Sequence, residues 1–198
     1  MASRADAPAR TAGPSDAALV VAARAGEAWA REALFRRYAR MVFGLVYRLM
    51  GRDHEVEDLV QEAFVQALAR LHALAEPQAF GGWLTSVVVR TTQKALRRRV
   101  VARRIGLRHA DAPVDFDSLV APTAPPDAQA ELRAVYRILD DLPARLRVAL
   151  VLRRVEGMSQ EEVAAAMAVS VSTAKRLLVE ADLRLEEALR DPRPRRTP

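Results

Sequence analysis

The apolar residues of this 198-residue chain recur at helical spacing, three and four positions apart, over most of its length. Alternation of the kind that marks a β-strand is hard to find. Four helices are predicted in the first part, at 16–26, 27–51, 53–71 and 80–104, and about four more between 127 and 190. The pattern therefore predicts an all-α protein.

Residues that favour helix ends support these boundaries. Asp16 and Asp53 are expected to cap the first and third helices, because a short polar side chain can accept a bond from the free amides there. Gly51 is expected to end the second helix. The expected buried positions of the second and third helices are Leu34, Tyr38, Val42, Leu45, Leu49, Val56, Leu59, Val60, Ala63, Ala67 and Leu71.

A segment without helical or strand periodicity, 110–126, divides the chain into two blocks. Its Pro, Asp and Ala content is typical of a flexible tether. We therefore expect two different small helical bundles, at 16–109 and 127–190. The terminal segments 1–15 and 191–198 are expected to be disordered.

Residues 158–181, "MSQEEVAAAMAVSVSTAKRLLVEA", predict two short helices with almost no loop between them. Ser159 and Glu162 have the spacing of a capping box. Ala168 stands at the turn, where glycine is commoner, and Ser170 or Ser172 caps the next helix. The expected inner stripe of that helix is Ala174, Leu178, Ala181, Leu185 and Leu189.

This pattern favours a helix-turn-helix, whose second helix enters the DNA major groove with its first residues toward the base edges. The groove-facing residues would be Ser172, Thr173, Lys175 and Arg176. The alternative is an ordinary helical hairpin with a solvated polar face.

The charge distribution also favours a polyanionic partner. The net charge is +6 and the sequence pI is about 10.6. No acidic residue occurs from Pro77 to Arg108. Four cations in this stretch lie three or four apart on one helical face that suits a phosphate backbone: Arg90, Lys94, Arg97 and Arg98. A solvated basic face is the alternative, although like charges at this spacing repel.

The third predicted helix begins with acidic residues, which the helix dipole alone partly explains. Asp58, Gln61 and Glu62 lie on a polar face that a protein partner could bind.

Other chemistry finds little support. There is no cysteine, no apolar run near the ~20 residues of a membrane span, and no apolar core of a signal peptide. His54, His72 and His109 are isolated, and no nucleophile, phosphate loop or metal-ligand spacing is evident. We expect no cofactor, no membrane association, no enzymatic activity and a cytoplasmic location.

Two segments resemble a known family. "LFRRYARMVFGLVYRLMG", "EVEDLVQEAFVQALARL" and "FGGWL" resemble the second conserved region of the extracytoplasmic-function (ECF) sigma factors of bacterial RNA polymerase. "LDDLPARLRVALVLRRVEGMSQEEVAAAMAVSVSTAKRLL" resembles their fourth region. The resemblance covers about 16–189, and "DLVQEAF" is its most specific part.

The resemblance implies the fold and the partners. Asp58, Gln61 and Glu62 would dock on the clamp helices of the polymerase beta-prime subunit. The helix from Phe80 would lie against the −10 promoter element. The helix-turn-helix would read the −35 element, and its block would meet the flap of the beta subunit. An anti-sigma factor is a further expected partner.

The chain departs from the family at five DNA-facing places. Family members often have Asn and Asp at the places of Arg90 and Lys94, and Arg at those of Leu177, Glu180 and Asp182. Two alternatives to a promoter-reading sigma factor stay open. One is a sigma-like regulator that binds polymerase but reads DNA weakly, and the other is a stand-alone helix-turn-helix regulator.

Overall fold

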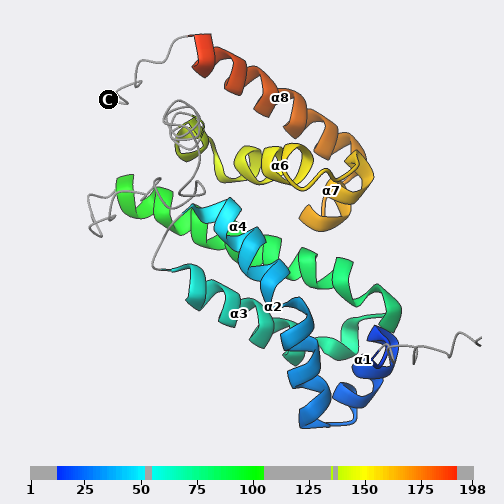
Figure 1. Cartoon of the computed structure of the whole chain (residues 1–198). Coiled ribbons are helices and arrows are strands. Elements are labelled where there is room, and N and C mark those ends of the chain that lie inside the picture. The colour runs from blue at the N-terminus through cyan, green and yellow to red at the C-terminus, as the bar shows by residue number, and fades with distance from the viewer. Residues whose placement is uncertain (1–12, 52–54, 105–134, 136–137, 191–198) are drawn as a thin grey trace, which may run out of the picture.

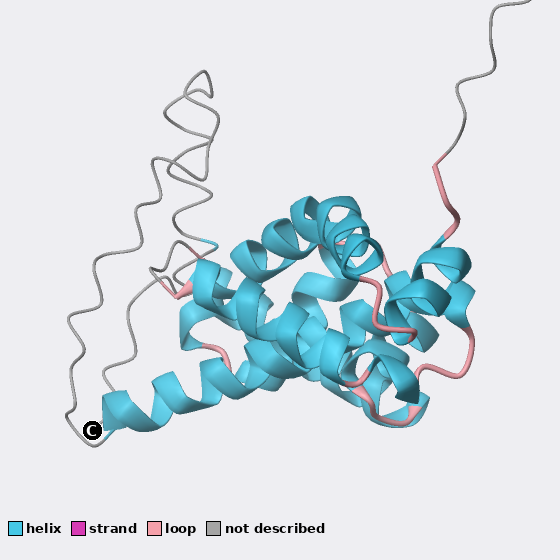
Figure 2. Cartoon of the chain, turned by 90° about the horizontal axis from the view of Figure 1, so that it is seen from below, coloured by secondary structure: helices cyan, strands magenta, loops and turns pink. Residues whose placement is uncertain are grey.

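The computed structural model describes residues 13–51, 55–104, 135 and 138–190. Within these residues the chain forms helices joined by short loops and contains no strand (Figure 2). The helices are α1 (Asp16–Arg24), α2 (Ala28–Met50), α3 (Val56–Ala69), α4 (Phe80–Arg104), α6 (Ala144–Arg154), α7 (Gln160–Met167) and α8 (Val171–Arg190). The predicted all-α class is confirmed.

Two helix starts differ from the prediction. Ser15 caps α1, its Oγ accepting from the Ala18 amide at 3.2 Å, whereas Asp16 is the first residue of the helix. The Asp16 carboxylate instead accepts from the side chains of Arg37 and Tyr38 on α2. Glu55 occupies the N-cap position of α3, and Asp53 lies outside the described residues. Gly51 ends α2 as expected, with a φ of 74° that favours glycine.

The predicted buried stripes of α2 and α3 are confirmed, except that Tyr38 is half-buried. On α8, Ala174, Leu178 and Ala181 are buried and Leu185 is half-buried. Leu189 is 57% exposed, so its assignment to the inner stripe was wrong. Two short 3₁₀ turns, Leu71–Ala73 and Pro77–Ala79, connect α3 to α4.

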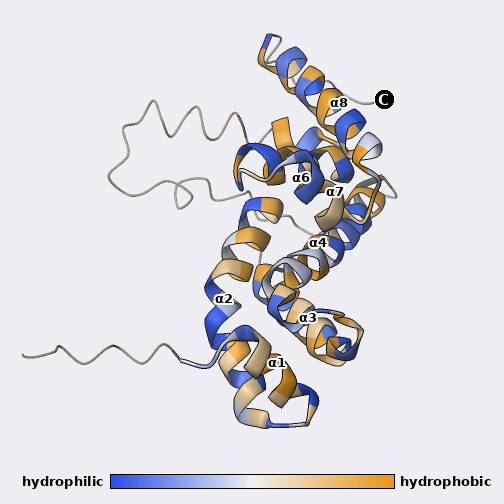
Figure 3. Ribbon diagram, turned by 90° about the vertical axis from the view of Figure 1, so that its right-hand side faces the viewer, coloured by the Kyte–Doolittle hydropathy of each residue, from blue (hydrophilic) through white to orange (hydrophobic). Residues whose placement is uncertain are grey.

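The long helix α4 lies in the middle of the molecule, between α2 and α3 on one side and α6 and α7 on the other (Figure 1). Each helix carries both hydrophobic and hydrophilic positions, which alternate along its ribbon (Figure 3). The buried apolar residues of both blocks join in one cluster. The predicted tether 110–126 and tail 191–198 lie outside the described residues, as do residues 1–12 of the predicted N-terminal segment.

Candidate nucleic-acid and polymerase interfaces

The turn between α7 and α8 has the geometry that the sequence predicts. The Ser159 Oγ accepts from the Glu162 amide at 3.1 Å, and the Glu162 carboxylate accepts from the Ser159 amide at 2.7 Å. Ala168 then adopts the left-handed conformation, with φ 53° and ψ 50°. This single residue reverses the chain, which explains how two helices meet with almost no loop.

The start of α8 presents the predicted groove-facing side chains. Of the two predicted caps, Ser170 caps the helix, because its Oγ accepts from the Thr173 amide at 3.2 Å. Ser172, Lys175 and Arg176 are exposed, and Thr173 is half-buried with its hydroxyl 2.8 Å from that of Ser170. The exposed group combines a hydroxyl and two cations, which suits contacts to base edges and phosphates.

Three departures from the family on α8 have structural explanations. Leu177 is buried in the core, at 8% exposure, so it does not face a groove. Asp182 forms an ion pair with Arg154 on α6, with 3.1 Å between Oδ1 and Nη2. Glu180 lies 4.0 Å from Arg184, one turn further along α8. The two acids are thus offset by cations of their own domain.

All four predicted cations of α4 are exposed: Arg90, Lys94, Arg97 and Arg98. Arg97 donates to the Oε1 of Gln93 at 3.0 Å, which orients its guanidinium along the helix. The neighbouring Arg99 is half-buried and donates to the carbonyl of Met50 at the end of α2, so it contributes to packing. The four exposed cations form a basic stripe, which we call the α4 stripe.

On α3, Asp58 and Gln61 are exposed and Glu62 is half-buried. The Glu62 carboxylate accepts from the Nε2 of Gln66 at 2.9 Å, which restrains its orientation. One turn beyond Gln61, Val65 is 65% exposed. This apolar residue was not among the predicted docking residues, although an apolar side chain on a predicted polar face is a signal that the sequence offers. A partner docking on this face would cover both acidic and apolar surface.

An aromatic group at the start of α4 was not among the predicted site residues. The rings of Phe80 and Tyr38 meet edge-on, with centroids 5.2 Å apart. The Tyr38 hydroxyl donates to the Asp16 carboxylate. Burial raises the pKa of Tyr38, and the hydrogen bond to Asp16 and the negative charge of Asp16 raise it further, to about 12. Gly81 allows the helix to approach, because a Cβ there would lie 3.1 Å from the Tyr38 ring.

The part of the chain that the structure describes holds no group of three or more His, Asp or Glu residues that could bind a metal ion. In that same part, no helix combines the length and the apolar character that a membrane crossing requires.

Comparison with protein-family models assigns both blocks. Residues 34–101 match the model for sigma-70 region 2, and residues 132–185 match a model for sigma-70 region 4. The first match contains α3 and most of α4. The second contains α6, α7 and most of α8.

Several curated proteins are similar to the chain. The ECF RNA polymerase sigma factor SigE of Mycolicibacterium smegmatis is 34% identical over 72% of this chain, which spans about half (54%) of that relative. The RNA polymerase sigma-H factor of Pseudomonas aeruginosa is 30% identical over 88% of this chain and 93% of its own length. The ECF sigma-E factor of Escherichia coli is 32% identical over 81% of this chain and 87% of its own length.

Solved structures share the fold. CnrH, in complex with the cytosolic domain of CnrY, matches with a TM-score of 0.60 at 22% identity, over 89% of this chain and 98% of its own. The sigma factor RpoE of Bartonella quintana, in complex with the anti-sigma factor NepR, matches with a TM-score of 0.58 at 22% identity. The match covers 82% of this chain and 98% of the RpoE chain. With both conserved regions present in order and these relatives matched along most of the chain, the chain belongs to the sigma-70 family of RNA polymerase sigma factors, in its ECF group.

Proposed function

We propose that this chain is an ECF-type initiation factor, which binds core RNA polymerase and directs it to specific promoters. The proposal rests on the match of residues 34–101 and 132–185 to the two conserved sigma-70 regions. The turn between α7 and α8 supports it, because it has helix-turn-helix geometry. The factor itself carries out no chemical reaction; polymerase does. Because its partners are polymerase and DNA, it acts in the cytoplasm.

Each block has a distinct task in this proposal. In the first domain, 16–109, Asp58, Gln61 and Glu62 dock on the beta-prime clamp helices, and α4 lies against the −10 element. In the second domain, 127–190, the start of α8 reads the −35 element, and the block meets the beta flap. An anti-sigma factor is the expected inhibitor, since the structural relative RpoE was solved with one.

The test is a pull-down of purified core polymerase by the tagged full chain, followed by run-off transcription on a genomic fragment library. We expect a stable complex and transcripts that start at a small set of fragments sharing a sequence. Core polymerase alone, and polymerase with a chain lacking the second domain, are the controls. If the chain binds DNA but never retains polymerase, it is a stand-alone helix-turn-helix regulator.

The acids on α8 favour one second candidate, a regulator that binds polymerase but reads DNA weakly. Glu180 and Asp182 follow the exposed start of the helix and would repel phosphates if their ion pairs opened. For that candidate, the chain would retain polymerase, and the run-off assay would give no transcript from any fragment.

A further inference from the structure

Lysine is rare in this chain, and its two occurrences are not scattered. Of the 31 lysine and arginine residues, only Lys94 and Lys175 are lysines. Lys94 belongs to the α4 stripe, and Lys175 lies at the start of α8. Only six of the 31 cations were predicted to face DNA, and both lysines are among these six. A general preference for arginine explains why lysine is rare, but not why each predicted DNA surface contains one.

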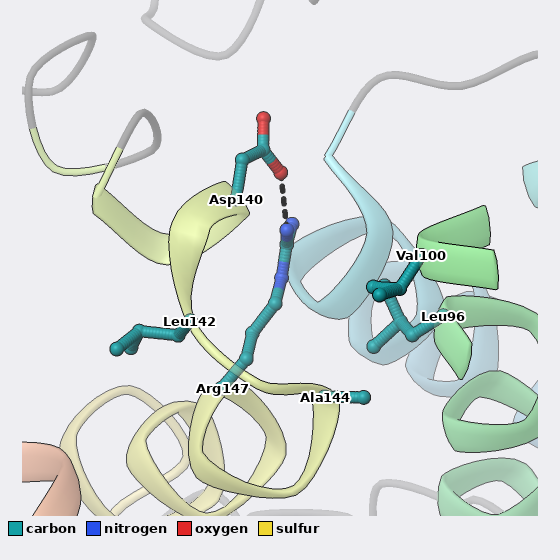
Figure 4. A pocket seen from close by; sticks show the side chains of 6 residues that line it. All are labelled: Leu96, Val100, Asp140, Leu142, Ala144 and Arg147. Atoms are coloured by element: carbon teal, nitrogen blue, oxygen red, sulfur yellow. Dashed lines mark hydrogen bonds and ion pairs between the residues drawn. The ribbon is translucent and has the colours of Figure 1, made fainter. Parts of the chain in front are cut away.

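Arginine side chains, in contrast, hold contacts of the fold. Arg48 on α2 donates from Nε and Nη2 to the carboxylate of Glu156, with 3.0 Å between Nη2 and Oε2. Arg147 on α6 is buried and donates to the carboxylate of Asp140 (Figure 4). The first contact uses two nitrogens of the planar guanidinium, which a lysine ammonium cannot reproduce. Arginine at such positions is therefore explained by packing and hydrogen bonding.

The two lysines hold no such contact. Both side chains are exposed, and within the described residues neither ammonium group has a hydrogen-bond or ion-pair partner. Loss of either positive charge would therefore leave the packing of α4 and α8 intact.

Loss of these charges would, however, change both surfaces that attract DNA. The α4 stripe would fall from four cations to three. The second domain, with ten basic and eleven acidic residues, would change from a net charge of −1 to −2. At the start of α8, only Arg176 would still attract phosphates. Each lost phosphate contact should lower DNA affinity about three- to fivefold near physiological salt.

Lysine also has a reactivity that arginine lacks. Its side-chain amine, in the uncharged form, is a nucleophile, whereas the guanidinium stays protonated. The nitrogen lone pair can attack the carbonyl carbon of an acyl phosphate or an acyl thioester. The bond from that carbon to the leaving phosphate or thiolate breaks, the leaving group keeps the electron pair, and the nitrogen gives up a proton to water. The product is an uncharged amide, and nothing is oxidised or reduced.

We propose that Lys94 and Lys175 are acylation sites, whose modification by an acyl phosphate or an acyl thioester switches off promoter reading. Acylation removes a positive charge from each DNA surface but leaves polymerase docking intact, because the expected docking residues of α3 include no amine. The acylated chain therefore occupies polymerase without reading a promoter. The inference rests on the proposed function, since it assigns a control to the same two DNA surfaces.

Modification is tested on the full chain in three arms, each followed by peptide mass spectrometry. One arm uses acetyl phosphate, the second uses acetyl-coenzyme A, and the third maps the chain purified from the bacterium that encodes it. We expect acylation of both lysines, and protection of both when the chain is bound to polymerase and promoter DNA. The donor arm that reacts identifies the class of donor. No acylation of either lysine in any arm overturns the proposal.

The consequence is tested by comparing acetylated with untreated chain on core polymerase. Binding of the holoenzyme to a promoter duplex should weaken about tenfold, because two separate phosphate contacts are lost. The slope of log affinity against log salt should fall by about two units. Affinity for core polymerase should stay the same. Acetylated chain added to an untreated reaction should then lower transcription in proportion to its share of polymerase. Weaker polymerase binding with unaltered DNA binding overturns the proposal.

The matched control is Lys94→Arg with Lys175→Arg, which keeps both charges but cannot be acylated. Each protein is compared with itself before and after treatment, and the variant should bind promoter DNA equally in both states. If treatment weakens both proteins equally, other groups are responsible. If the variant has lost promoter binding before treatment, the lysines are retained for the geometry of their contacts. Either result overturns the proposal.

The two proposals fail in different ways. If the untreated chain transcribes no fragment, the proposed function fails, whatever the mass spectra show. If the untreated and the acetylated chains transcribe the selected fragments equally, the proposed function stands and control by acylation is wrong.

Discussion

Arg154 and Asp182 join α6 to α8 through two hydrogen bonds, because both Nε and Nη2 of Arg154 donate to the same carboxylate oxygen, at 3.3 and 3.1 Å. Many family members carry an arginine where this chain has Asp182. Here the position connects two helices of the second domain, so its acid supports the placement of α8.

Asp182→Asn should therefore lower the free energy of unfolding by less than about 1 kcal/mol, since both partners are substantially exposed. It should leave discrimination between cognate and scrambled promoters unchanged. Urea denaturation of Asp182→Asn, Arg154→Gln and the double variant measures the coupling between the two residues. A change in promoter preference in Asp182→Asn would mean that the acid faces DNA.

Gln61→Ala with Glu62→Ala should weaken binding to core polymerase, because both side chains lie on the expected docking face of α3. Stability should change by no more than ~0.5 kcal/mol at the exposed Gln61, and by about 1 kcal/mol or less at Glu62, which is half-buried and loses one hydrogen bond. Affinity measured by fluorescence anisotropy tests this. Gln66→Ala keeps Gln61 and Glu62 and removes only the hydrogen bond that orients Glu62, so it should weaken binding less than the double variant. Unaltered affinity in the double variant would leave the docking assignment without support.

Arg97→Ala with Arg98→Ala should weaken holoenzyme binding to all DNA sequences. Loss of two phosphate contacts should lower the slope of log affinity against log salt by about two units. The second domain contains ten basic and eleven acidic residues, so it cannot replace this attraction. Binding to one promoter and one scrambled duplex across a salt series provides the measurement, and an unchanged slope would contradict it.

Arg176→Ala should act differently, because Arg176 is exposed at the start of α8 where base edges would lie. We expect a loss of about 1–3 kcal/mol at the cognate −35 element and little loss on scrambled DNA. Arg184→Ala, further along the same helix, is the control. Equal weakening on both duplexes would assign Arg176 to the phosphate backbone.

The raised pKa of Tyr38 predicts a loss of stability at alkaline pH. In the unfolded chain the phenol ionises near pH 10, whereas in the folded chain it holds its proton to about pH 12. The free energy of unfolding should therefore fall between pH 10 and 12. Tyr38→Phe should show a smaller fall in urea denaturation over that interval. Parallel curves for the two proteins would show that other groups cause the loss.

Much of the fold could be predicted because its determinants are local. The capping box of Ser159 and Glu162 and the buried stripe of α3 follow from the spacing of a few residues. The start of α1 was misplaced by one residue because Ser15 and Asp16 are both good caps, and only three-dimensional contacts show that Asp16 is bound by Tyr38 and Arg37.

The contact between the domains could not be predicted from the sequence. Arg48 and Glu156 are 108 positions apart, and each looks like an ordinary surface residue of its helix or loop. Leu96 and Val100 stand among cations in the sequence, and nothing in their spacing indicates a contact with the second domain. The α4 stripe was predicted because its cations recur about one helical turn apart, which places them on one face of the helix.

The continuous apolar cluster through both blocks has a consequence for cooperativity. Two bundles with separate cores would melt independently, each with its own enthalpy. Here α4 supplies side chains to both halves, so unfolding of one half removes packing from the other. The chain should therefore melt as one calorimetric unit, with equal van't Hoff and calorimetric enthalpies.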